Sequence, residues 1–330
     1  MPFEARDVDI FVLTYNRSSL LPATLRSLLA QSARGASITV LDNASQDDTQ
    51  QTVETFASEG VTYARASSNL GWAGNLARAQ QQARRPWTMV FHDDDLLHPD
   101  YLRHALEAIN TQPGVGMVVS AMSFETAPGE TDWPATTPRS LLCPGVSALA
   151  MLCYAGAPIH FGSALYRTDI FKSLRWESER FGKIADRPFL LAACASSACQ
   201  VFLSPLVRYR IHAQQDSTSS DSGPFAPQLA ALHHCYRSYL GENPLQSAGR
   251  CFLRHNYRSI ADEFGRLGRA DRTRFPTLAA YLAFLLEAGA CSRFSLACGK
   301  LLCQLQCVDR GLSGLFHGLV RWSHRWRRRS

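Results

Sequence analysis

The sequence predicts an α/β fold in which a mostly parallel sheet carries helices on both faces, with a helical region after it. Two observations indicate this class: short apolar runs alternate with segments of helical periodicity, and a polar loop follows each apolar run. The chain has 330 residues, of which 46% are hydrophobic and 19% are charged. This composition excludes a disordered chain and a small disulfide-bonded module.

The first half of the chain repeats a strand–helix unit. Apolar runs predict four strands, at residues 8–14, 37–43, 61–66 and 87–91. Helical spacing of apolar residues predicts a helix after each of the first three strands, at 21–29, after a cap at Ser45 or Asp47, and at 75–83. Connections of this length join parallel strands, so the four strands should form one parallel sheet.

The second half is less regular. The pattern predicts further strands and helices at 116–124, 145–155, 162–167, 185–195 and 200–212. A segment rich in Pro, Thr and Gly at 125–139 has the composition of a loop, and a Ser/Asp/Gly-rich linker spans 214–224. We therefore predict one domain over residues 1–218 and a separate helical region over 219–330.

Cysteine usage and the ends of the chain bear on where the protein acts. The ten cysteines fall at irregular positions without zinc-finger spacing, which favours reduced thiols and a cytoplasmic protein. The first residues lack the pattern of a signal peptide, and no window holds the roughly 18 apolar residues of a membrane span. The net charge of +6 is concentrated in the final "RWSHRWRRRS".

Three adjacent carboxylates, Asp93 to Asp95, follow the fourth predicted strand in "MVFHDDDLLHP". They repel one another, and a divalent cation such as Mg²⁺ would compensate this repulsion. The alternative is a solvated turn that caps the following helix. The cation is favoured because other polar groups also end predicted strands: Thr14 to Arg17, Asp42 with Asn43, and Asn69 to Gly71. In an open α/β sheet such ends converge on one ligand crevice.

An ordered set of motifs gives the chain a family resemblance: "VLTYNR", "VLDNASQDDT", "SSNLGWAGNLARA", "FHDDDLLHPDYL", "GSALYR", "ADRPFL" and "YRIHAQQDS". In this order they closely resemble inverting family 2 glycosyltransferases of the GT-A fold, over about residues 7–218. The resemblance implies a nucleotide-sugar half at about 1–125 and an acceptor half at about 126–218. It implies a UDP- or dTDP-type sugar donor, a divalent metal (Mn²⁺ or Mg²⁺), and a saccharide or lipid-linked glycan as acceptor, in cell-surface polysaccharide, O-antigen or glycolipid synthesis.

The resemblance also assigns residues to the nucleotide-sugar site. Its members are expected to surround the nucleoside diphosphate: Thr14, Tyr15, Arg17, Asp42, Asn43, Asn69, Gly71, Asn75 and Asp93. Asp42 would hydrogen-bond the base edge, and Gly71 would allow the backbone to approach the ligand closely. From the residues alone, Asp42 with Asn43 also fits a turn cap, and Asn69 to Gly71 equally fit a plain turn.

The implied metal ligands are Asp94, Asp95 and His212, with Asp94 favoured. The chain departs from the family pattern at His92, which stands where the first aspartate of the metal-binding motif is expected. Asp93 and Asp95 are each also candidates for a metal ligand or a ribose contact. From the residues alone, a lone histidine that ends a strand, such as His212, is more often structural.

Asp186 corresponds to the general base that removes the proton of the acceptor hydroxyl. Here the chain departs from the family again, because Ala185 replaces the usual glutamate before this aspartate. The alternative for Asp186 is a helix cap paired with Arg187 or Arg180.

The sequence indicates less clearly which residues bind the acceptor and whether the protein contacts a membrane. Aromatic and polar residues between 139 and 180, including His160, Phe161, Trp176 and Arg180, suit a sugar but also suit an ordinary core. The C-terminal "GLFHGLVRWSHRWRRR" predicts a basic, tryptophan-bearing helix. Such a helix fits a peripheral contact with the inner membrane face, or packing on its own domain with a solvated tail.

Three other functions compete with the transferase. A hydrolase with paired carboxylates would need no nucleotide site. A non-catalytic nucleotide-sugar-binding scaffold fits the departures at His92 and Ala185. Nucleic-acid binding through the arginine-rich tail has weak support, because one short basic run lacks recognition elements, so we expect no nucleic-acid partner.

Overall fold

The computed structural model describes residues 1–125, 133, 137–154, 157–212 and 225–240. The chain divides into two compact units, Met1–Leu245 and Gln246–Ser330. The second unit, which contains the basic tail, lies outside the described residues. Helix α9 (Phe225–Leu240) belongs to the first unit, beyond the predicted boundary at residue 218. The predicted division into domains stays a prediction.

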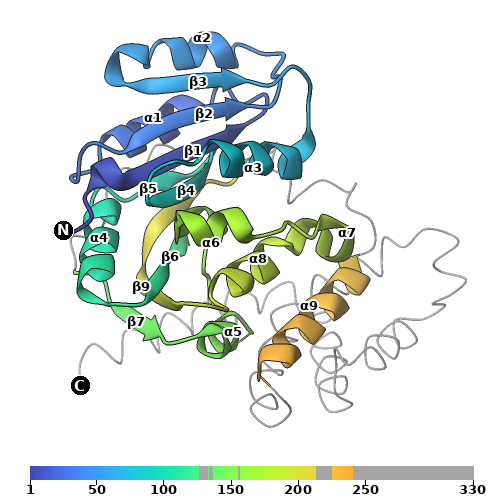
Figure 1. Cartoon of the computed structure of the whole chain (residues 1–330). Coiled ribbons are helices and arrows are strands. Elements are labelled where there is room, and N and C mark those ends of the chain that lie inside the picture. Colours follow the sequence, from blue (N-terminus) through green and yellow to red (C-terminus); the bar gives the residue numbers. More distant parts are fainter. Residues whose placement is uncertain (126–132, 134–136, 155–156, 213–224, 241–330) are drawn as a thin grey trace, which may run out of the picture. The chain divides into compact units, whose positions relative to one another are not determined.

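A single mixed sheet forms the centre of the described part (Figure 1), with strand order β3-β2-β1-β4-β8-β6-β9-β5 and β7 beside β9. Its strands are β1 (Val8–Thr14), β2 (Ser37–Asp42), β3 (Val61–Arg65), β4 (Trp87–His92), β5 (Leu96–Leu97), β6 (Val115–Phe124), β7 (Ser140–Cys143), β8 (Leu165–Arg167) and β9 (Ala198–Tyr209). The first four strands are parallel, as predicted. β8 runs antiparallel to both β4 and β6, so the parallel arrangement does not extend through the second half.

Helices lie on both sides of this sheet. They are α1 (Leu21–Leu29), α2 (Thr49–Glu54), α3 (Gly71–Gln82), α4 (Tyr101–Thr111), α5 (Val146–Tyr154), α6 (Thr168–Ser173), α7 (Ser178–Phe181) and α8 (Asp186–Ala193), besides α9. Gln31, just after α1, ties this helix to α4, since its side chain donates to the His98 carbonyl at 2.8 Å and accepts from the Leu102 amide at 3.0 Å. Gln80 ties α3 to α6 by donating to the Phe171 carbonyl at 2.8 Å.

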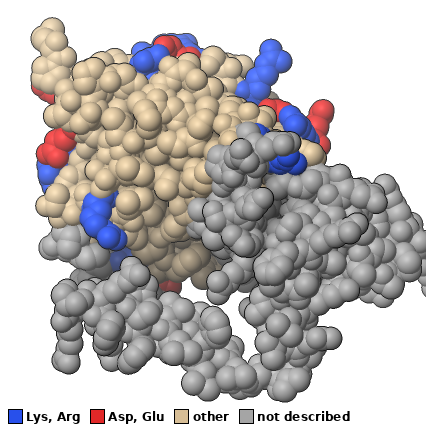
Figure 2. Space-filling view, turned by 90° about the horizontal axis from the view of Figure 1, so that it is seen from below, with Lys and Arg blue, Asp and Glu red and all other residues tan. Residues whose placement is uncertain are grey.

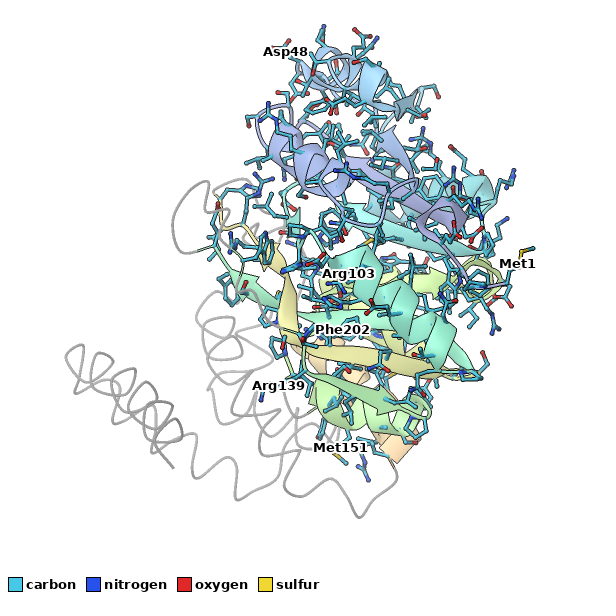
Figure 3. All side chains as sticks on the ribbon, turned by 90° about the vertical axis from the view of Figure 1, so that its left-hand side faces the viewer. Met1, Asp48, Arg103, Arg139, Met151 and Phe202 are labelled. Atoms are coloured by element: carbon cyan, nitrogen blue, oxygen red, sulfur yellow. The ribbon has the colours of Figure 1, made fainter. Side chains whose placement is uncertain are left out.

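The core explains why the chain adopts this order. All seven residues of β1 are buried, and all but Asp9 and Thr14 are apolar, as expected for a central strand covered on both faces. Leu21, Leu25 and Leu28 place one buried face of α1 on the sheet. Burying each such side chain contributes about 1.5–3 kcal/mol. Figure 3 labels Phe202 on β9, whose ring lies 6.2 Å from that of His104 on α4.

The structure corrects one predicted helix and adds short elements. α3 begins at Gly71, four residues before the predicted start at residue 75. The prediction missed this start because two glycines in the first turn give the segment the composition of a loop. The strands β5 and β7 and the helices α6 and α7 were not predicted. Each has six residues or fewer, which is too short for a periodic pattern to indicate it.

Two further observations bear on the sequence analysis. The cysteines within the described ranges are free thiols, at positions 143, 153, 194, 199 and 235. Among the helices that the structure describes, none is long and apolar enough to cross a membrane. On the face shown in Figure 2, charged side chains of the described part are scattered near the rim of a largely uncharged surface.

Candidate active site

The carboxyl ends of four strands meet in register at one edge of the sheet. Thr14 at the end of β1 pairs with Asp42 at the end of β2, which in turn pairs with Arg65 of β3. On the other side, Leu13 pairs with His92 of β4, so Asp93 continues the row beside Thr14. Residues that are far apart in the sequence therefore line one edge, as predicted for a ligand crevice.

The first loop is tied to its neighbours by its backbone. The Tyr15 amide donates to Asp93 Oδ2 at 3.4 Å, and the Asn43 amide donates to the Thr14 carbonyl at 2.9 Å. Asn16, at φ 55°, accepts from the Gln46 amide at 2.7 Å. The Tyr15 side chain is 40% exposed, so its ring is accessible to a ligand.

The Asp42 carboxylate is fully engaged inside the protein. Its side chain is buried, Oδ1 accepts from the Ser45 amide at 2.9 Å, and Oδ2 accepts from the Tyr63 hydroxyl at 2.5 Å. Arg65 Nη1 lies 3.7 Å from Oδ2. Burial and the bond to Asp42 raise the pKa of Tyr63 far above its ordinary value, so this hydroxyl stays a donor. The base of a bound nucleotide could hydrogen-bond the Asp42 carboxylate only by replacing one of these partners.

The Asn43 side chain joins two loops. Its Nδ2 donates to Asn69 Oδ1 at 2.8 Å and to the Gly71 carbonyl at 3.2 Å, while its Oδ1 accepts from the Leu70 amide at 2.8 Å. Gly71 has φ 69°, and a Cβ at this position would meet no atom of the described residues within 4 Å. The backbone conformation is therefore what favours glycine here.

Asn75 faces the interior. Its Nδ2 donates to the Leu41 carbonyl at 2.8 Å and its Oδ1 accepts from Arg78 Nη1, also at 2.8 Å. Arg78 in turn donates to the carbonyls of Asp42 and Ala64 at 3.0 and 2.7 Å. Asn75 thus fixes α3 against the ends of β2 and β3.

The three aspartates have three different surroundings. Asp93 is buried beside Asp94, and burial together with the charge of Asp94 raises the pKa of Asp93 to about 7. Asp94 is partly exposed, and its Oδ2 lies 2.9 Å from His212 Nε2. This contact joins two of the predicted metal ligands across 118 residues.

Arg210 fixes the backbone around this pair. It donates through Nε to the Asp94 carbonyl and through Nη2 to the Leu20 carbonyl and Thr24 Oγ1, both at 2.9 Å. Thr24 itself donates to the Asp93 carbonyl at 2.8 Å. The end of β9, the aspartate loop and the start of α1 are therefore bound into one unit.

Asp95, the third predicted metal ligand, faces away from this pair. Its Oδ2 lies 3.0 Å from His160 Nε2 and 3.4 Å from His92 Nδ1. Burial alone raises the pKa of Asp95, but the charges of His160 and His92 outweigh burial and hold it below its ordinary value. Burial lowers the pKa of His92, whereas its contacts with Asp95 and the other aspartates raise it to about 9.

Sequence reasoning did not group these two histidines with Asp95. His92 was visible only as a departure from the aspartate motif. His160 lies 65 residues after Asp95 and was assigned to the acceptor region, and no local pattern connects it to the aspartates.

Asp186 is the first residue of α8, with 29% of its side chain exposed. Its Oδ2 lies 3.7 Å from Arg187 Nε, and Arg187 Nη1 donates to the Ile159 carbonyl at 3.1 Å. Arg180, the other partner considered for Asp186, instead approaches Glu177 at 3.7 Å. Because Ile159 precedes His160, the candidate base and the aspartate loop are linked through consecutive contacts.

Aromatic rings connect the two halves of the site. Trp72, in the first turn of α3, lies 4.0 Å from Trp176 and 5.6 Å from Phe161, measured between ring centroids. Phe161 stacks on His92 at 6.1 Å. Both tryptophans are half-buried, so this ring cluster is at once packed and accessible.

Comparisons with known proteins identify the family of the chain. The family model described as Glycosyl transferase family 2 matches residues 9–175, half of the chain. An uncharacterized glycosyltransferase of Haemophilus influenzae is 23% identical over 226 residues, covering 65% of this chain and 72% of that protein. The succinoglycan biosynthesis protein ExoO of Rhizobium meliloti is 25% identical over 227 residues, covering 64% of this chain and 62% of ExoO.

Solved structures show the same fold. S. aureus TarS in complex with UDP has a TM-score of 0.59 at 16% identity, covering 81% of this chain and 76% of that chain. The mannosyltransferase PcManGT from Pyrobaculum calidifontis, in complex with GDP-Man and Mn²⁺, has a TM-score of 0.50 at 17% identity, covering 94% and 82%. The α/β fold is thus that of GT-A glycosyltransferases, and the chain is a glycosyltransferase that belongs to glycosyl transferase family 2.

Proposed function

We propose that this glycosyltransferase moves a sugar, with inversion, from a UDP- or dTDP-type donor to an acceptor hydroxyl in the synthesis of a cell-surface polysaccharide, O-antigen or glycolipid. The observation that carries the proposal is the 2.9 Å contact between Asp94 and His212 at the edge where four strands end. The similarity to a succinoglycan biosynthesis protein supports the polysaccharide class.

The residues present fit the divalent cation that the family implies. Asp94 offers a carboxylate oxygen and His212 an imidazole nitrogen, with 17% and 15% of their side chains exposed, so phosphate oxygens and water can complete the coordination. When bound, the cation would offset the negative charge that grows on the leaving nucleoside diphosphate. Mn²⁺ or Mg²⁺ is proposed, and Asp95 is the weaker candidate ligand because its carboxylate faces His92 and His160.

For the donor, the accessible groups are proposed to make the direct contacts and the buried ones to hold them in place. Tyr15, Arg17, Asn69 and the Gly71 backbone lie on the partly or fully exposed side of the strand ends. The more buried set supports these loops and acts on the nucleotide through them: Thr14, Asn43, Asn75 and Asp93. Asp42 reaches the base edge if the base takes over the hydrogen bond that Tyr63 now donates.

Asp186 is proposed as the general base. Its carboxylate accepts the proton of the acceptor hydroxyl as that oxygen attacks the anomeric carbon, and the bond to the nucleoside diphosphate breaks on the opposite side. The position at the start of α8 and the contact with Arg187 hold the carboxylate in one orientation. No covalent enzyme intermediate is needed.

The ring cluster of Trp72, Phe161 and Trp176 is proposed as the wall against which the acceptor sugar packs. Aromatic faces offer a large apolar surface with little conformational freedom to lose. A saccharide or lipid-linked glycan fits such a wall.

The test is a panel of nucleotide sugars titrated into the full chain with and without Mn²⁺. We expect one donor to bind with metal dependence and to be consumed when acceptor is present. Asp94→Asn and His212→Gln should each abolish the metal dependence of binding, while Asp48→Asn, an exposed aspartate after β2, should not. Tight donor binding without sugar transfer or release would instead support a non-catalytic scaffold. Glycoside hydrolysis without any nucleotide would support a hydrolase.

The proposed site of action is the cytoplasm, with peripheral contact at the inner membrane face through the basic tail. Basic, tryptophan-bearing helices bind anionic surfaces. Deleting residues 321–330 should release the protein from anionic liposomes without changing donor affinity. Unchanged liposome binding would contradict the contact.

A further inference from the structure

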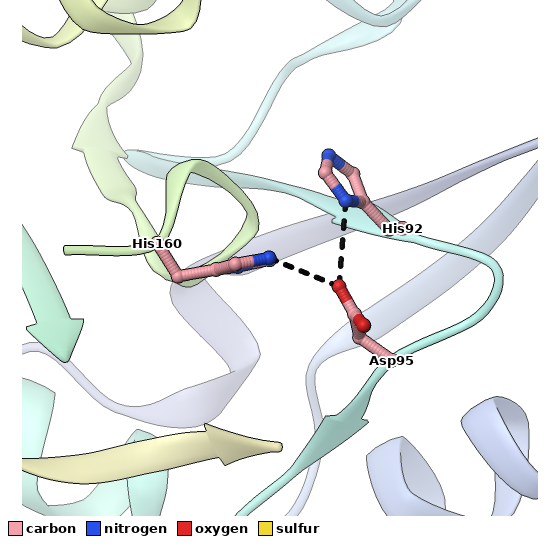
Figure 4. A group of neighbouring side chains, drawn as sticks. All are labelled: His92, Asp95 and His160. Atoms are coloured by element: carbon pink, nitrogen blue, oxygen red, sulfur yellow. Dashed lines mark ion pairs between the residues drawn. The ribbon is translucent and has the colours of Figure 1, made fainter. Parts of the chain in front are cut away.

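Three side chains from separate segments converge beside the aspartate loop (Figure 4). His92 ends β4, Asp95 precedes β5, and His160 stands just before the short helix η3 (Phe161–Ser163). Asp95 Oδ2 lies 3.0 Å from His160 Nε2 and 3.4 Å from His92 Nδ1, and the three atoms all lie within 4.8 Å of one another.

The shared carboxylate oxygen is buried and lacks a hydrogen bond. Asp95 Oδ1 accepts from the Arg210 amide at 3.2 Å, whereas Oδ2 has no hydrogen-bond partner among the described residues, although two imidazole nitrogens lie close to it. The Asp95 side chain is fully buried and that of His160 is 6% exposed. A buried carboxylate is costly unless a positive charge compensates it, and here that charge is either a protonated imidazole or a cation that all three side chains bind.

The distances suit a metal ion. Two imidazoles and one carboxylate form a ligand set that zinc and other divalent transition metals prefer. With metal–ligand bonds of about 2.0–2.2 Å, neighbouring ligand atoms of a tetrahedral site lie about 3.3–3.5 Å apart. The distances of 3.0 and 3.4 Å are close to this spacing. His92 is 28% exposed, which leaves one side open to water.

The backbone is shaped to let both rings reach this carboxylate. A Cβ on Gly162 would lie 3.0 Å from His160 Cε1 and 3.6 Å from His92 Cδ2. A contact of 3.0 Å is tighter than an ordinary carbon contact, so a larger residue at this position would require the His160 ring to shift by a few tenths of an ångström.

We propose that His92, Asp95 and His160 form a second cation site, which binds a divalent transition metal such as Zn²⁺ and is separate from the Asp94–His212 pair. Neighbouring aspartates supply the two sites, since Asp94 faces His212 and Asp95 faces the two histidines. The ion joins the end of β4 to the loop that carries Ile159, and the Ile159 carbonyl holds Arg187 beside Asp186. It would therefore fix the acceptor side of the site against the donor side.

The competing explanation is an ion pair in which a protonated histidine alone compensates Asp95. It requires no metal and predicts no metal affinity at these residues. Metal binding by the protein without any donor separates the two explanations, and it does not depend on the proposed transferase reaction.

The experiment treats the full chain with chelator, removes the chelator, and titrates Co²⁺ without nucleotide while recording visible absorption and bound metal. Without nucleotide the Asp94–His212 pair lacks the phosphate oxygens that complete its coordination, so we expect one tightly bound equivalent, with the visible bands of a nitrogen- and oxygen-ligated, low-coordinate ion. His160→Gln and His92→Gln should each weaken this binding at least ten-fold. Removing a group that only supports a ligand already lowers metal affinity by about that factor, and removing the ligand itself should lower it further. Asp94→Asn and His212→Gln are the matched controls and should leave it unchanged.

Three outcomes would overturn the proposal: no saturable binding, binding that survives both histidine substitutions, or a near-ultraviolet band that marks cysteine ligation. His92 is partly exposed, so His92→Gln remains informative if His160→Gln fails to fold. Unfolding temperature gives a second readout, because Zn²⁺ should raise it in the wild type and not in His92→Gln. Donor titration with Mn²⁺ on the same variants shows separately whether the nucleotide site is intact.

Discussion

The proposed donor half (about 1–125) and the proposed acceptor half (about 126–218) of the site are held together differently. At the donor strand ends, amide and hydroxyl groups bond neighbouring loops at fixed distances, with Asn43 and Asp42 at the centre. On the acceptor side, rings such as Trp176 and Phe161 pack against one another. Hydrogen bonds specify one geometry, whereas ring contacts tolerate several. This difference suggests a preformed donor pocket and an acceptor wall that can vary without loss of the fold.

The largest expected effect tests the chemistry of the acceptor half. Asp186→Asn should lower kcat by about 10²–10⁴-fold, because a positioned general base contributes that much. Donor affinity, measured by titration with Mn²⁺, should stay unchanged. Asp169→Asn, an exposed aspartate paired with Arg167, is the control and should keep full activity. Retained turnover in Asp186→Asn would remove this residue from the role.

The next effect tests the hydrogen-bonded character of the donor half. Asn43→Ala should lower the free energy of unfolding by about 1–3 kcal/mol, because it leaves buried polar partners unsatisfied. Donor affinity should fall as well, since two loops lose their common contact. Asn110→Ala is the control, because this exposed amide also makes two backbone bonds, to Phe3. If chemical denaturation showed equal losses of unfolding free energy in both variants, Asn43 would contribute no more to stability than an exposed amide does.

A smaller effect tests the ring cluster. Trp176→Ala should raise the acceptor KM about ten-fold, or about 1.4 kcal/mol, and leave the donor dissociation constant unchanged. Phe124→Ala, an exposed ring that packs on Tyr209, is the control. If donor binding fell and acceptor KM did not, the rings would belong to the donor half.

The smallest effect concerns backbone conformation. Gly71→Ala should cost about 1 kcal/mol of stability, because L-residues disfavour positive φ. Gly145→Ala has equally open space and lacks positive φ, so its unfolding free energy should stay close to that of the wild type. A loss of donor affinity in Gly71→Ala that exceeds the loss of stability would indicate close approach of the ligand to this backbone.

The same contrast explains how far sequence reasoning reached. Buried strands such as β1 are largely apolar runs, and their polar ends are adjacent in the sequence, so the fold and the donor edge followed from local patterns. The start of α3 was missed because Gly71 and Gly74 give its first turn the composition of a loop. The side chains that bond the backbone there, from Asn43 and Asn69, lie before the helix.

The acceptor half offered fewer local signals. Asp94 and His212 were paired only through the family resemblance, since 118 residues separate them. His160 meets Asp95 because β8 returns antiparallel between β4 and β6, which brings the preceding loop over the end of β4. Such a juxtaposition depends on tertiary topology, and no spacing along the chain encodes it.

Arg210 has a consequence for how this chain tolerates change. Its guanidinium bonds the aspartate loop and the start of α1, and the imidazole that faces Asp94 follows only two positions later. Arg210 thus fixes where His212 lies. Inserting a single residue between Arg210 and His212 would move the imidazole away from Asp94 while leaving the hydrogen bonds of Arg210 intact. A change of length between Arg210 and His212 is therefore expected to abolish the contact with Asp94.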